Sequence, residues 1–453
     1  MLTMISKSGE VDRHPKDALL KLAESLSDEY QPVVGPLASR QAELFGIQAK
    51  RLQGTPSDVF RRPSYQSDEA VVSAEIFTKG DTLIVIRLVE YGRQRPVRNE
   101  EGKLERREEV IRLVAVSYAA PKIDKEVTAE FELHVKKIWG VELRERVTSP
   151  RKLEENAPLG RGGKAEVASV EDVRGAKALS DKSSRALAVS IKSSRGLLLS
   201  DAPKQIPPKD KGRLNEIVRS LIEAGIVETE IVVICSSTSS QVNKIPSVEV
   251  LQEMDRRNVR CSCGNYLSAE RTEEALNITE HGKFMLDGSR WLSVLVLQGL
   301  IDLGVPIENI RMEQEYAGEE VDCMAEIYGK LVLFELKDKQ FNLGNAYSFG
   351  AKVGIFRPDY PVIVTTEKVG SDARRHFMQS AQSGKRRMYY SKSDRSGAEG
   401  MVFIEGMGNL QEGLEGLVSS IAIEAFSPHV QSALSFSMAS PGAILSAWAG
   451  KER

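Results

Sequence analysis

The chain has 453 residues, of which 41% are hydrophobic and 28% charged. This composition excludes a wholly disordered, collagen-like or simple coiled-coil chain, and the length favours roughly two to four folded domains. The formal net charge is only -2, so any surface that binds nucleic acid has to be a local basic patch.

Neither the cysteines nor the beginning of the chain suggest export. Four cysteines are too few for a disulfide framework and indicate a reducing compartment. The first residues contain no apolar signal-peptide core, and no run of about eighteen apolar residues follows. We therefore expect a cytoplasmic protein that does not span a membrane.

The first third of the chain predicts a helical segment followed by a sheet. Residues 1–65 contain a helical apolar pattern and then a polar stretch with prolines. Residues 66–150 change to an alternating pattern with a period of two, for example over 82–89 and 110–116. This alternation is typical of strands, so we predict a small β-rich domain there.

Residues 151–209 are rich in Lys, Arg, Ser and Gly and contain two copies of the tetrapeptide KSSR, at Lys182 and Lys192. The favoured interpretation is a flexible basic linker. The alternative is an arm that contacts phosphates, because unordered lysines and arginines can neutralise a nucleic-acid backbone without a packed fold.

Residues 210–286 show two helical patterns. The first, over 212–227, has one apolar stripe and is closed by Gly225, and the second covers 246–258. Thr279 and Gly282 then form a T-x-x-G pattern. Together these features resemble a winged-helix domain, which implies that this region binds either DNA or a protein.

From residue 289 the pattern predicts a helix, three strands, a helix, a strand and a helix, within a domain over 287–405. Gly329 and Lys330 suggest a tight hairpin turn between the second and third strands. Glu335 and Lys337 interrupt the apolar third strand on one face. Burying these two charges costs free energy unless each finds a partner or a metal ion.

Asp322 lies on the strand before Glu335 and Lys337. A turn at Gly329 and Lys330 would place Asp322 opposite Lys337 and diagonal to Glu335. Two carboxylates beside a lysine suit a hard cation such as Mg²⁺ or Mn²⁺, with phosphate as a further ligand. The simpler alternative is a cross-strand Asp–Lys ion pair.

These residues resemble the PD-(D/E)xK nuclease superfamily: Asp322, a spacer, and then Glu335-Leu336-Lys337. The resemblance covers about residues 286–385. It implies a restriction endonuclease-like αβββαβ core in which Asp322 and Glu335 are metal ligands and Lys337 is catalytic. Two departures stand out. The helix over 290–301 lacks the Glu found in many members, with Gln298 or Asp287 as the only substitutes. Some branches of the family have a glutamine in the helix after the lysine, and the only candidate here, Gln340, lies too early in the chain.

Basic residues follow this core and could contact a nucleic-acid backbone without reading its sequence; an ordinary solvated surface is the alternative. They are Arg374, Arg375, Lys385, Arg386 and Arg387. Residues 406–453 form a C-terminal tail with apolar helical patterns, which we expect to pack on the core or on a partner subunit.

The cysteines give a weaker signal. Cys261-Ser262-Cys263-Gly264 is similar to half of a zinc knuckle, and Cys235 could supply a third ligand. Because no second well-spaced pair follows, simple thiols are the favoured interpretation, and zinc binding stays open. Cys323 is expected to lie in the core.

The sequence therefore predicts an α/β multi-domain protein with a nuclease-like core, an upstream winged-helix-like domain and an N-terminal β-rich domain. The expected function is metal-dependent endonuclease hydrolysis of DNA phosphodiester bonds, in bacterial defence or DNA processing. The alternative is a non-catalytic DNA-binding or regulatory subunit that keeps the nuclease fold as a scaffold. A protein partner or a second copy of the chain is also possible.

Overall fold

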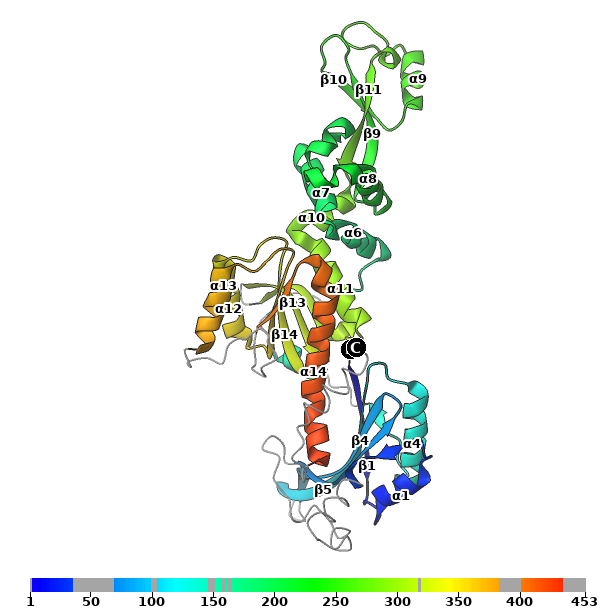
Figure 1. Ribbon diagram of the computed structural model, residues 1–453, viewed down its shortest axis with the longest axis vertical. Coiled ribbons are helices and arrows are strands. Elements are labelled where there is room, and N and C mark those ends of the chain that lie inside the picture. The colour runs from blue at the N-terminus through cyan, green and yellow to red at the C-terminus, as the bar shows by residue number, and fades with distance from the viewer. Residues whose placement is uncertain are drawn as a thin grey trace. The chain divides into compact units, whose positions relative to one another are not determined.

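The structure is a computed structural model. It describes residues 2–35, 69–98, 104–145, 151–156, 160–161, 165–316, 319–382 and 401–434. The chain divides into two compact units, one formed by Met1–Arg151 with Glu415–Arg453 and the other by Lys152–Leu414. The described residues build three separate sheets and many helices (Figure 1). The chain is therefore a mixed α/β protein, as its sequence predicts.

The first unit is built on an antiparallel sheet with the strand order β2-β3-β4-β5-β1-β6. Its strands are β1 (Thr3–Val11), β2 (Gln31–Pro32), β3 (Glu69–Lys79), β4 (Thr82–Arg98), β5 (Leu104–Ala120) and β6 (Arg144–Glu145). The strands predicted within 66–150 are confirmed. The prediction of a helical segment over 1–65 is wrong at its beginning, because β1 pairs with β5 from Thr3–Ala120 to Val11–Arg112.

Helices α1 (Ala18–Ser25) and α4 (Lys125–Trp139) cover one face of this sheet. Phe131 of α4 is fully buried and lies at the centre of the core, with Phe77 and Tyr118 of the sheet packed edge-on against its ring. Asp124 caps the start of α4 by accepting the Glu126 N–H, and Gly140 ends the helix in the left-handed region.

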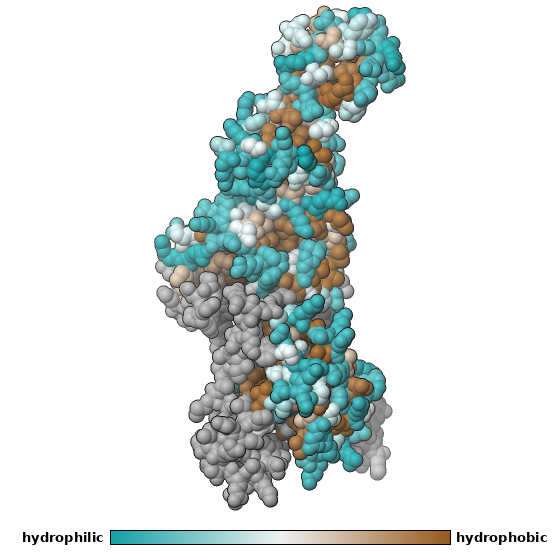
Figure 2. Space-filling model, turned by 45° about the vertical axis from the view of Figure 1, so that its right-hand side comes forward, coloured by the Kyte–Doolittle hydropathy of each residue, from teal (hydrophilic) through white to brown (hydrophobic). Residues whose placement is uncertain are grey.

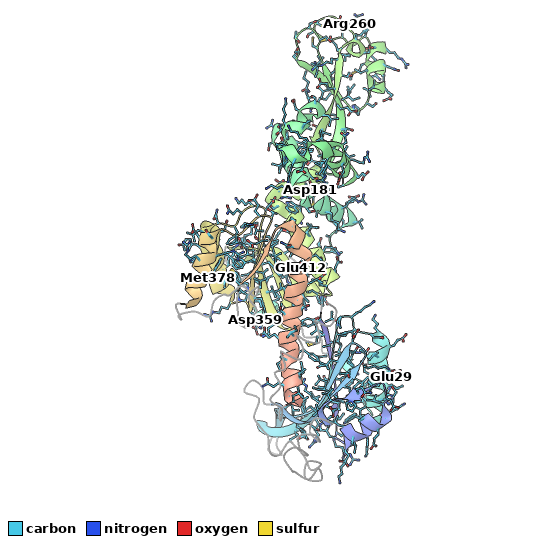
Figure 3. The ribbon with its side chains drawn as sticks, viewed as in Figure 1. Glu29, Asp181, Arg260, Asp359, Met378 and Glu412 are labelled. Atoms are coloured by element: carbon cyan, nitrogen blue, oxygen red, sulfur yellow. The ribbon has the colours of Figure 1, made fainter. Side chains whose placement is uncertain are left out.

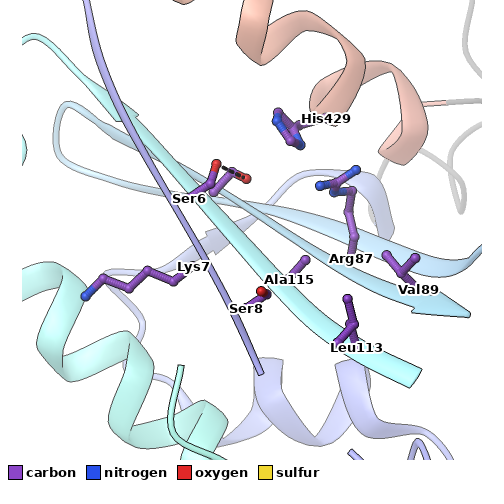
Figure 4. Close-up of a pocket in the computed structure, with 9 residues that line it drawn as sticks. Ser6, Lys7, Ser8, Arg87, Val89, Leu113, Ala115 and His429 are labelled. Carbon is purple, nitrogen blue, oxygen red and sulfur yellow. Dashed lines mark hydrogen bonds between the residues drawn. The ribbon is translucent and has the colours of Figure 1, made fainter. Parts of the chain in front are cut away.

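The other face of the sheet carries the end of α14 (Leu410–Ala433). Ser419 of this helix accepts the Leu2 N–H at 3.0 Å. His429 lies above the sheet and lines a small pocket with Ser6, Arg87 and neighbouring strand residues (Figure 4). The helix predicted in 406–453 is thus confirmed up to Ala433 and packs on the chain's own sheet, whereas residues 435–453 lie outside the described part.

Glu75 of β3 holds the segment that leads out of β2. Its carboxylate accepts the backbone N–H groups of Val34, Gly35 and Ile76 at 2.6, 3.0 and 2.8 Å. Burial raises the pKa of this carboxyl above its ordinary value of 4.5, although the N–H groups oppose the shift. Above pH 4.5 the folded chain therefore holds more protons at this site than the unfolded chain, and stability falls as pH rises toward the native pKa.

We expect Glu75→Gln to remove this dependence of stability on pH, because the amide does not titrate. The free energy of unfolding of the wild type, relative to the variant, should fall as pH rises from 4.5 through the raised native pKa. Urea denaturation across this pH range measures it, with the exposed Glu10→Gln as a control. A difference between wild type and Glu75→Gln that stays constant with pH would contradict the expectation.

The second unit begins with a helical region that continues into a small sheet. Its elements are α6 (Val170–Ser180), α7 (Lys182–Ser194), β8 (Leu197–Leu198), η3 (Leu199–Lys204), η4 (Pro208–Arg213), α8 (Leu214–Glu223), β9 (Val227–Ile234), β11 (Arg271–Ile278) and α10 (Glu280–Leu286). β11 pairs with both β9 and β8. Three helices followed by a hairpin thus begin at Val170, upstream of the predicted boundary at 210.

The prediction of a flexible linker over 151–209 is wrong for most of its length. Ser169 forms a capping box at the start of α6, and Asp181 caps α7 by accepting the Ser184 N–H at 2.8 Å. Both helices bury narrow stripes that include Leu179 and Leu187. The lysines lie around these stripes, whereas Ser183 and Ser184 of α7 are buried within one, so composition alone hid the periodic pattern.

The T-x-x-G pattern at residue 279 forms a helix start. Thr279 accepts the Gly282 N–H at 2.9 Å and donates its hydroxyl proton to the Gly225 carbonyl at 2.6 Å. A Cβ on Gly282 would lie only 2.2 Å from the Ile226 carbonyl oxygen. The glycine is therefore required by the close approach of α10 to the chain between α8 and β9.

Between β9 and β11 the chain forms a small lobe, residues 235–270, which we call the wing lobe. It contains β10 (Gln241–Ile245), α9 (Glu249–Arg256) and η5 (Leu267–Ala269). Its core includes Ile245, Leu251 and Leu267, together with Val233 of β9. Arg260 lies at the far end of the lobe (Figure 3), and the lobe's surface mixes hydrophilic with apolar residues (Figure 2).

The third sheet has the strand order β16-β15-β14-β13-β12-β7. Its strands are β7 (Gly160–Arg161), β12 (Ile310–Tyr316), β13 (Glu319–Ile327), β14 (Lys330–Lys337), β15 (Tyr360–Thr365) and β16 (Val402–Glu405). β12, β13 and β14 are antiparallel, whereas β14, β15 and β16 are parallel. The order of helix, three strands, helix, strand and helix agrees with the one predicted from residue 289.

Helices lie on both faces of this sheet (Figure 1). They are α5 (Arg151–Asn156), α11 (Arg290–Asp302), α12 (Leu343–Phe356) and α13 (Ser371–Gln382). Short 3-10 turns, η6 (Asp287–Ser289), η7 (Ile307–Asn309) and η8 (Met407–Asn409), precede α11, β12 and α14. Phe349 of α12 and Phe377 of α13 share a core with Leu333 of β14. At the start of β14, Asp359 accepts the Leu331 N–H at 2.7 Å (Figure 3).

One helical stretch among the described residues, Glu280–Asp302, is long and apolar enough to cross a membrane by composition alone. Half of its most apolar window is buried in the structure, and the core helix of a globular protein has the same character. Length and composition alone therefore do not identify this stretch as a membrane span, and the expected absence of a membrane span stays a prediction.

Candidate functional site

The candidate site lies in the hairpin of β13 and β14, and its turn consists of Tyr328 and Gly329. Both have positive φ angles, 49° and 73°, as in a type I′ turn, and Ile327 pairs with Lys330 across it. The predicted turn at Gly329 and Lys330 is wrong by one residue. The hairpin itself is confirmed.

The position of the turn decides which residues face each other. The ladder runs to Cys323 opposite Phe334, so its continuation brings Asp322 opposite Glu335. The prediction that Asp322 lies opposite Lys337 is therefore wrong. The pairing differs from the predicted one by two positions along β14, and side chains alternate with a period of two. Asp322, Glu335 and Lys337 therefore still share one face of the sheet.

Glu335 is the centre of the cluster and is only 2% exposed. One of its carboxylate oxygens lies 2.8 Å from Lys337 Nζ, and the other lies 2.9 Å from Lys352 Nζ. Lys352 comes from α12 and is itself 6% exposed. A buried carboxylate is stable when cations and hydrogen bonds satisfy both oxygens, and the two lysines provide this.

Asp322 lies at the edge of the cluster. Its Oδ2 accepts the Leu336 N–H at 2.6 Å and is 3.9 Å from Lys337 Nζ. Burial, followed by repulsion from Glu335, raises the pKa of Asp322 to about 6. Burial alone would lower the pKa of Lys337, but Glu335 and Asp322 outweigh burial and raise it. Lys337 is therefore an ammonium at neutral pH.

The cluster contains carboxylate oxygens, the ligand type that a hard divalent cation prefers, although both oxygens of Glu335 contact lysines. Asp322 and Glu335 offer carboxylate oxygens from neighbouring strands, and their mutual repulsion contributes to the raised pKa of Asp322. Mg²⁺ and Mn²⁺ prefer oxygen ligands and are often held by only one or two carboxylates. A cation between the two groups would relieve their repulsion.

Two charged residues near the cluster were missed from the sequence. Lys352 lies three residues after buried Phe349 and four before buried Phe356. A lysine on such an apolar stripe indicates a buried carboxylate partner. This pattern is visible in the sequence and could have identified Lys352. Glu320 lies two residues before Asp322 on the same face, close enough to help raise the pKa of Lys337. It is an exposed third acid beside the cluster.

The residues proposed to replace the missing helix acid have other partners. Gln298 donates to Asp302 at 2.7 Å within α11, and Asp287 forms an ion pair with Lys192 at 2.5 Å. Gln340 lies in the loop between β14 and α12, before the helix in which the family's glutamine is expected. α11 therefore supplies no carboxylate to the cluster in the described structure.

Asp338, which follows Lys337, anchors the end of β14 to the helices before it. Its carboxylate forms an ion pair with Arg185 of α7 at 3.0 Å and accepts the Trp291 Nε1–H at 3.2 Å. The guanidinium of Arg185 also lies over the Trp291 ring, 4.7 Å from its centroid. α7 and α11 thereby fix the strand end that carries the candidate site.

The predicted phosphate-contacting arginines differ in their surroundings. Arg374 forms an ion pair with Glu405 and stacks over the Phe403 ring. Arg375 is exposed and pairs with Asp372 at 3.3 Å, one turn away. Arg375 is thus the more accessible of the two. The other predicted contacts, Lys385, Arg386 and Arg387, lie outside the described residues.

The cysteines fall into two groups. Cys323 is fully buried next to Asp322, with its side chain on the opposite face of β13, as expected for a core residue. Cys235, Cys261 and Cys263 lie in the wing lobe.

No protein-family model matches the sequence, and no curated protein is similar enough to match it.

Proposed function

We propose that this chain is a metal-dependent nuclease that hydrolyses DNA phosphodiester bonds at the cluster of Asp322, Glu335 and Lys337. The observation that carries the proposal is the grouping of two carboxylates and a protonated lysine on one sheet face, with Glu335 and Lys337 in contact at 2.8 Å. The order of elements around them, α11-β12-β13-β14-α12-β15, supports a restriction endonuclease-like core of the PD-(D/E)xK type.

Asp322 and Glu335 would hold Mg²⁺ or Mn²⁺, which supplies Lewis-acid polarisation of a phosphate oxygen and a more acidic bound water. Lys337 is the more accessible cation of the site, because its side chain is 25% exposed and that of Lys352 only 8%. Its ammonium can orient an attacking water and offset the negative charge that develops on the phosphate. Lys352 is a positioning residue that holds the buried Glu335.

The region of α6, α7, α8 and the β9–β11 hairpin supports DNA as the substrate. Three helices followed by a hairpin, with the short strand β8 beside β11, resemble a winged-helix domain. Such domains place a helix in the major groove. Its surface charges are mixed: α8 exposes Arg219 together with Glu216 and Glu223. We therefore expect this domain to add a few phosphate contacts and little overall electrostatic attraction.

A second function is favoured by one observation. Both oxygens of Glu335 are occupied by lysines, and α11 adds no acid to the cluster. The same arrangement would suit a non-catalytic DNA-binding or regulatory subunit that keeps the nuclease fold as a scaffold, because two buried lysine contacts stabilise the carboxylate without a metal ion.

A cleavage assay separates the two functions. Purified protein is incubated with supercoiled plasmid, linear duplex, single-stranded DNA and RNA, with Mg²⁺, Mn²⁺ or EDTA. We expect cleavage of DNA with a metal ion and none with EDTA. Glu335→Gln protein, purified in the same way, controls for contaminating nucleases. Intact substrates together with a gel shift of DNA would support the DNA-binding function instead.

A further inference from the structure

The wing lobe brings together four potential metal ligands that lie far apart in the sequence. The sulfur atoms of Cys235, Cys261 and Cys263 and a carboxylate oxygen of Glu270 all lie within 4.8 Å of one another. Cys235 follows β9 directly, Cys261 and Cys263 share one turn, and Glu270 immediately precedes β11. The sequence alone suggested at most three ligands, because Glu270 belongs to no recognisable pair.

Two tight turns present the sulfur atoms. In the first, the Ser239 N–H donates to the Cys235 carbonyl at 2.8 Å. In the second, the Gly264 N–H donates to the Cys261 carbonyl at 2.8 Å, and Gly264 has a φ of 95°, which favours glycine. The second turn places Cys261 and Cys263 on one side of the chain, as in half of a zinc knuckle.

Glu270 is an unusual residue for its position. It is only 5% exposed, yet among the described residues no lysine, arginine or histidine forms an ion pair with it. Its Oε2 accepts the Ser236 N–H at 2.6 Å, and its Oε1 lies 2.8 Å from Cys263 Sγ. Hydrogen bonds alone hold this carboxylate, so a cation among the sulfur atoms would give it the opposite charge that it lacks.

The size of the wing lobe points the same way. From Cys235 to Glu270 it is shorter than the length of about 40 residues below which a domain usually needs a metal ion, disulfides or oligomerisation. Cys235 and Cys261 are themselves part of its small apolar core, beside Ile245 and Leu251. All three cysteines are free thiols in the structure, so no disulfide cross-links the lobe.

We propose that Cys235, Cys261, Cys263 and Glu270 bind one Zn²⁺ ion in a closed structural site. Thiolate ligands select zinc over Mg²⁺ or Ca²⁺, and four protein ligands leave no open position for catalysis. In a tetrahedral site with Zn–S bonds of about 2.3 Å, sulfur atoms lie roughly 3.8 Å apart, which is within the spacing seen here.

Binding converts the three thiols to thiolates and releases their protons to solvent. The contact between Cys263 and Glu270 is replaced by two bonds to the metal ion. The hydrogen bond from Ser236 then orients the carboxylate from outside the coordination shell. This site is independent of the proposed nuclease centre and stands whether or not the chain cleaves DNA.

Metal analysis of the full chain tests the proposal. Protein produced without a histidine tag in zinc-supplemented medium is freed of loosely bound metal by gel filtration and analysed by mass spectrometry for zinc. We expect about one zinc ion per chain. The double variant Cys261→Ser/Cys263→Ser should lose it, whereas the matched control Ser262→Ala should keep it. Zinc retained by the double variant would overturn the assignment.

Because the double variant could fail to fold, the wild-type chain provides a second test. Zinc is removed from the reduced protein and Co²⁺ is added, which gives a characteristic visible absorption in a tetrahedral thiolate site. We expect this spectrum in the wild type, and roughly tenfold weaker cobalt binding or more in Glu270→Gln. Reduced wild-type protein that contains no zinc and gives no such spectrum would overturn the proposal, as would a disulfide between Cys235 and Cys261.

Discussion

Lys337→Met is expected to reduce metal-dependent DNA cleavage by about 10²- to 10³-fold, because the site loses the ammonium that stabilises charge on the phosphate. The loss should appear in the rate of cleavage at saturating DNA, since Lys337 acts on the reacting phosphate and contributes little to binding the rest of the duplex. The fold should remain, because the side chain is partly exposed and methionine can fill the same space.

Initial rates of plasmid nicking measure this effect, and thermal unfolding checks the fold. Lys339→Met is the matched control, because Lys339 lies two residues further along the chain and is exposed. It removes the same charge from the same region without touching Glu335. Equal activity in the Lys337→Met and Lys339→Met proteins would argue against the assignment of Lys337 as a catalytic residue.

Lys352→Met is expected to destabilise the fold more than any surface substitution. Removing one partner of a buried ion pair commonly costs about 3–5 kcal/mol, because the remaining charge stays buried. Lys337 still contacts Glu335, so we expect a loss of about 3 kcal/mol in the free energy of unfolding, at the lower end of this range. Urea denaturation gives the value.

The double variant Lys352→Met/Glu335→Leu separates stability from activity. Apolar residues of similar size often replace a buried ion pair without loss, so most of the stability should return. Cleavage should be absent, because Glu335→Leu removes a proposed metal ligand. A Lys352→Met protein with an unchanged denaturation midpoint would show that the contact between Lys352 and Glu335 contributes nothing to the fold.

The sequence predicted the face of the candidate site but not its pairing. Alternation along β13 and β14 was enough to place Asp322, Glu335 and Lys337 on one side of the sheet. The pairing depends on the turn, which uses a positive φ at Tyr328. Aromatic residues rarely adopt this conformation, so the local sequence favoured a turn one residue later.

Other parts of the fold depend on partners that are distant in the sequence. β1 carries no strong apolar alternation, and it is held by pairing with β5, more than a hundred residues away. The role of Lys352 depends on Glu335, which lies on another element. Likewise, the role of Glu270 depends on the cysteines of the wing lobe. By contrast, α8 and α9 were predictable because each carries a complete local helical pattern.

The ladder between β9 and β11 ends where Ile234 pairs with Arg271, so the two ends of the wing lobe are neighbours. A segment joined to its host through two adjacent positions behaves as a removable module. Evolution could gain, lose or exchange such a module through a single insertion event without disturbing the helices that precede it.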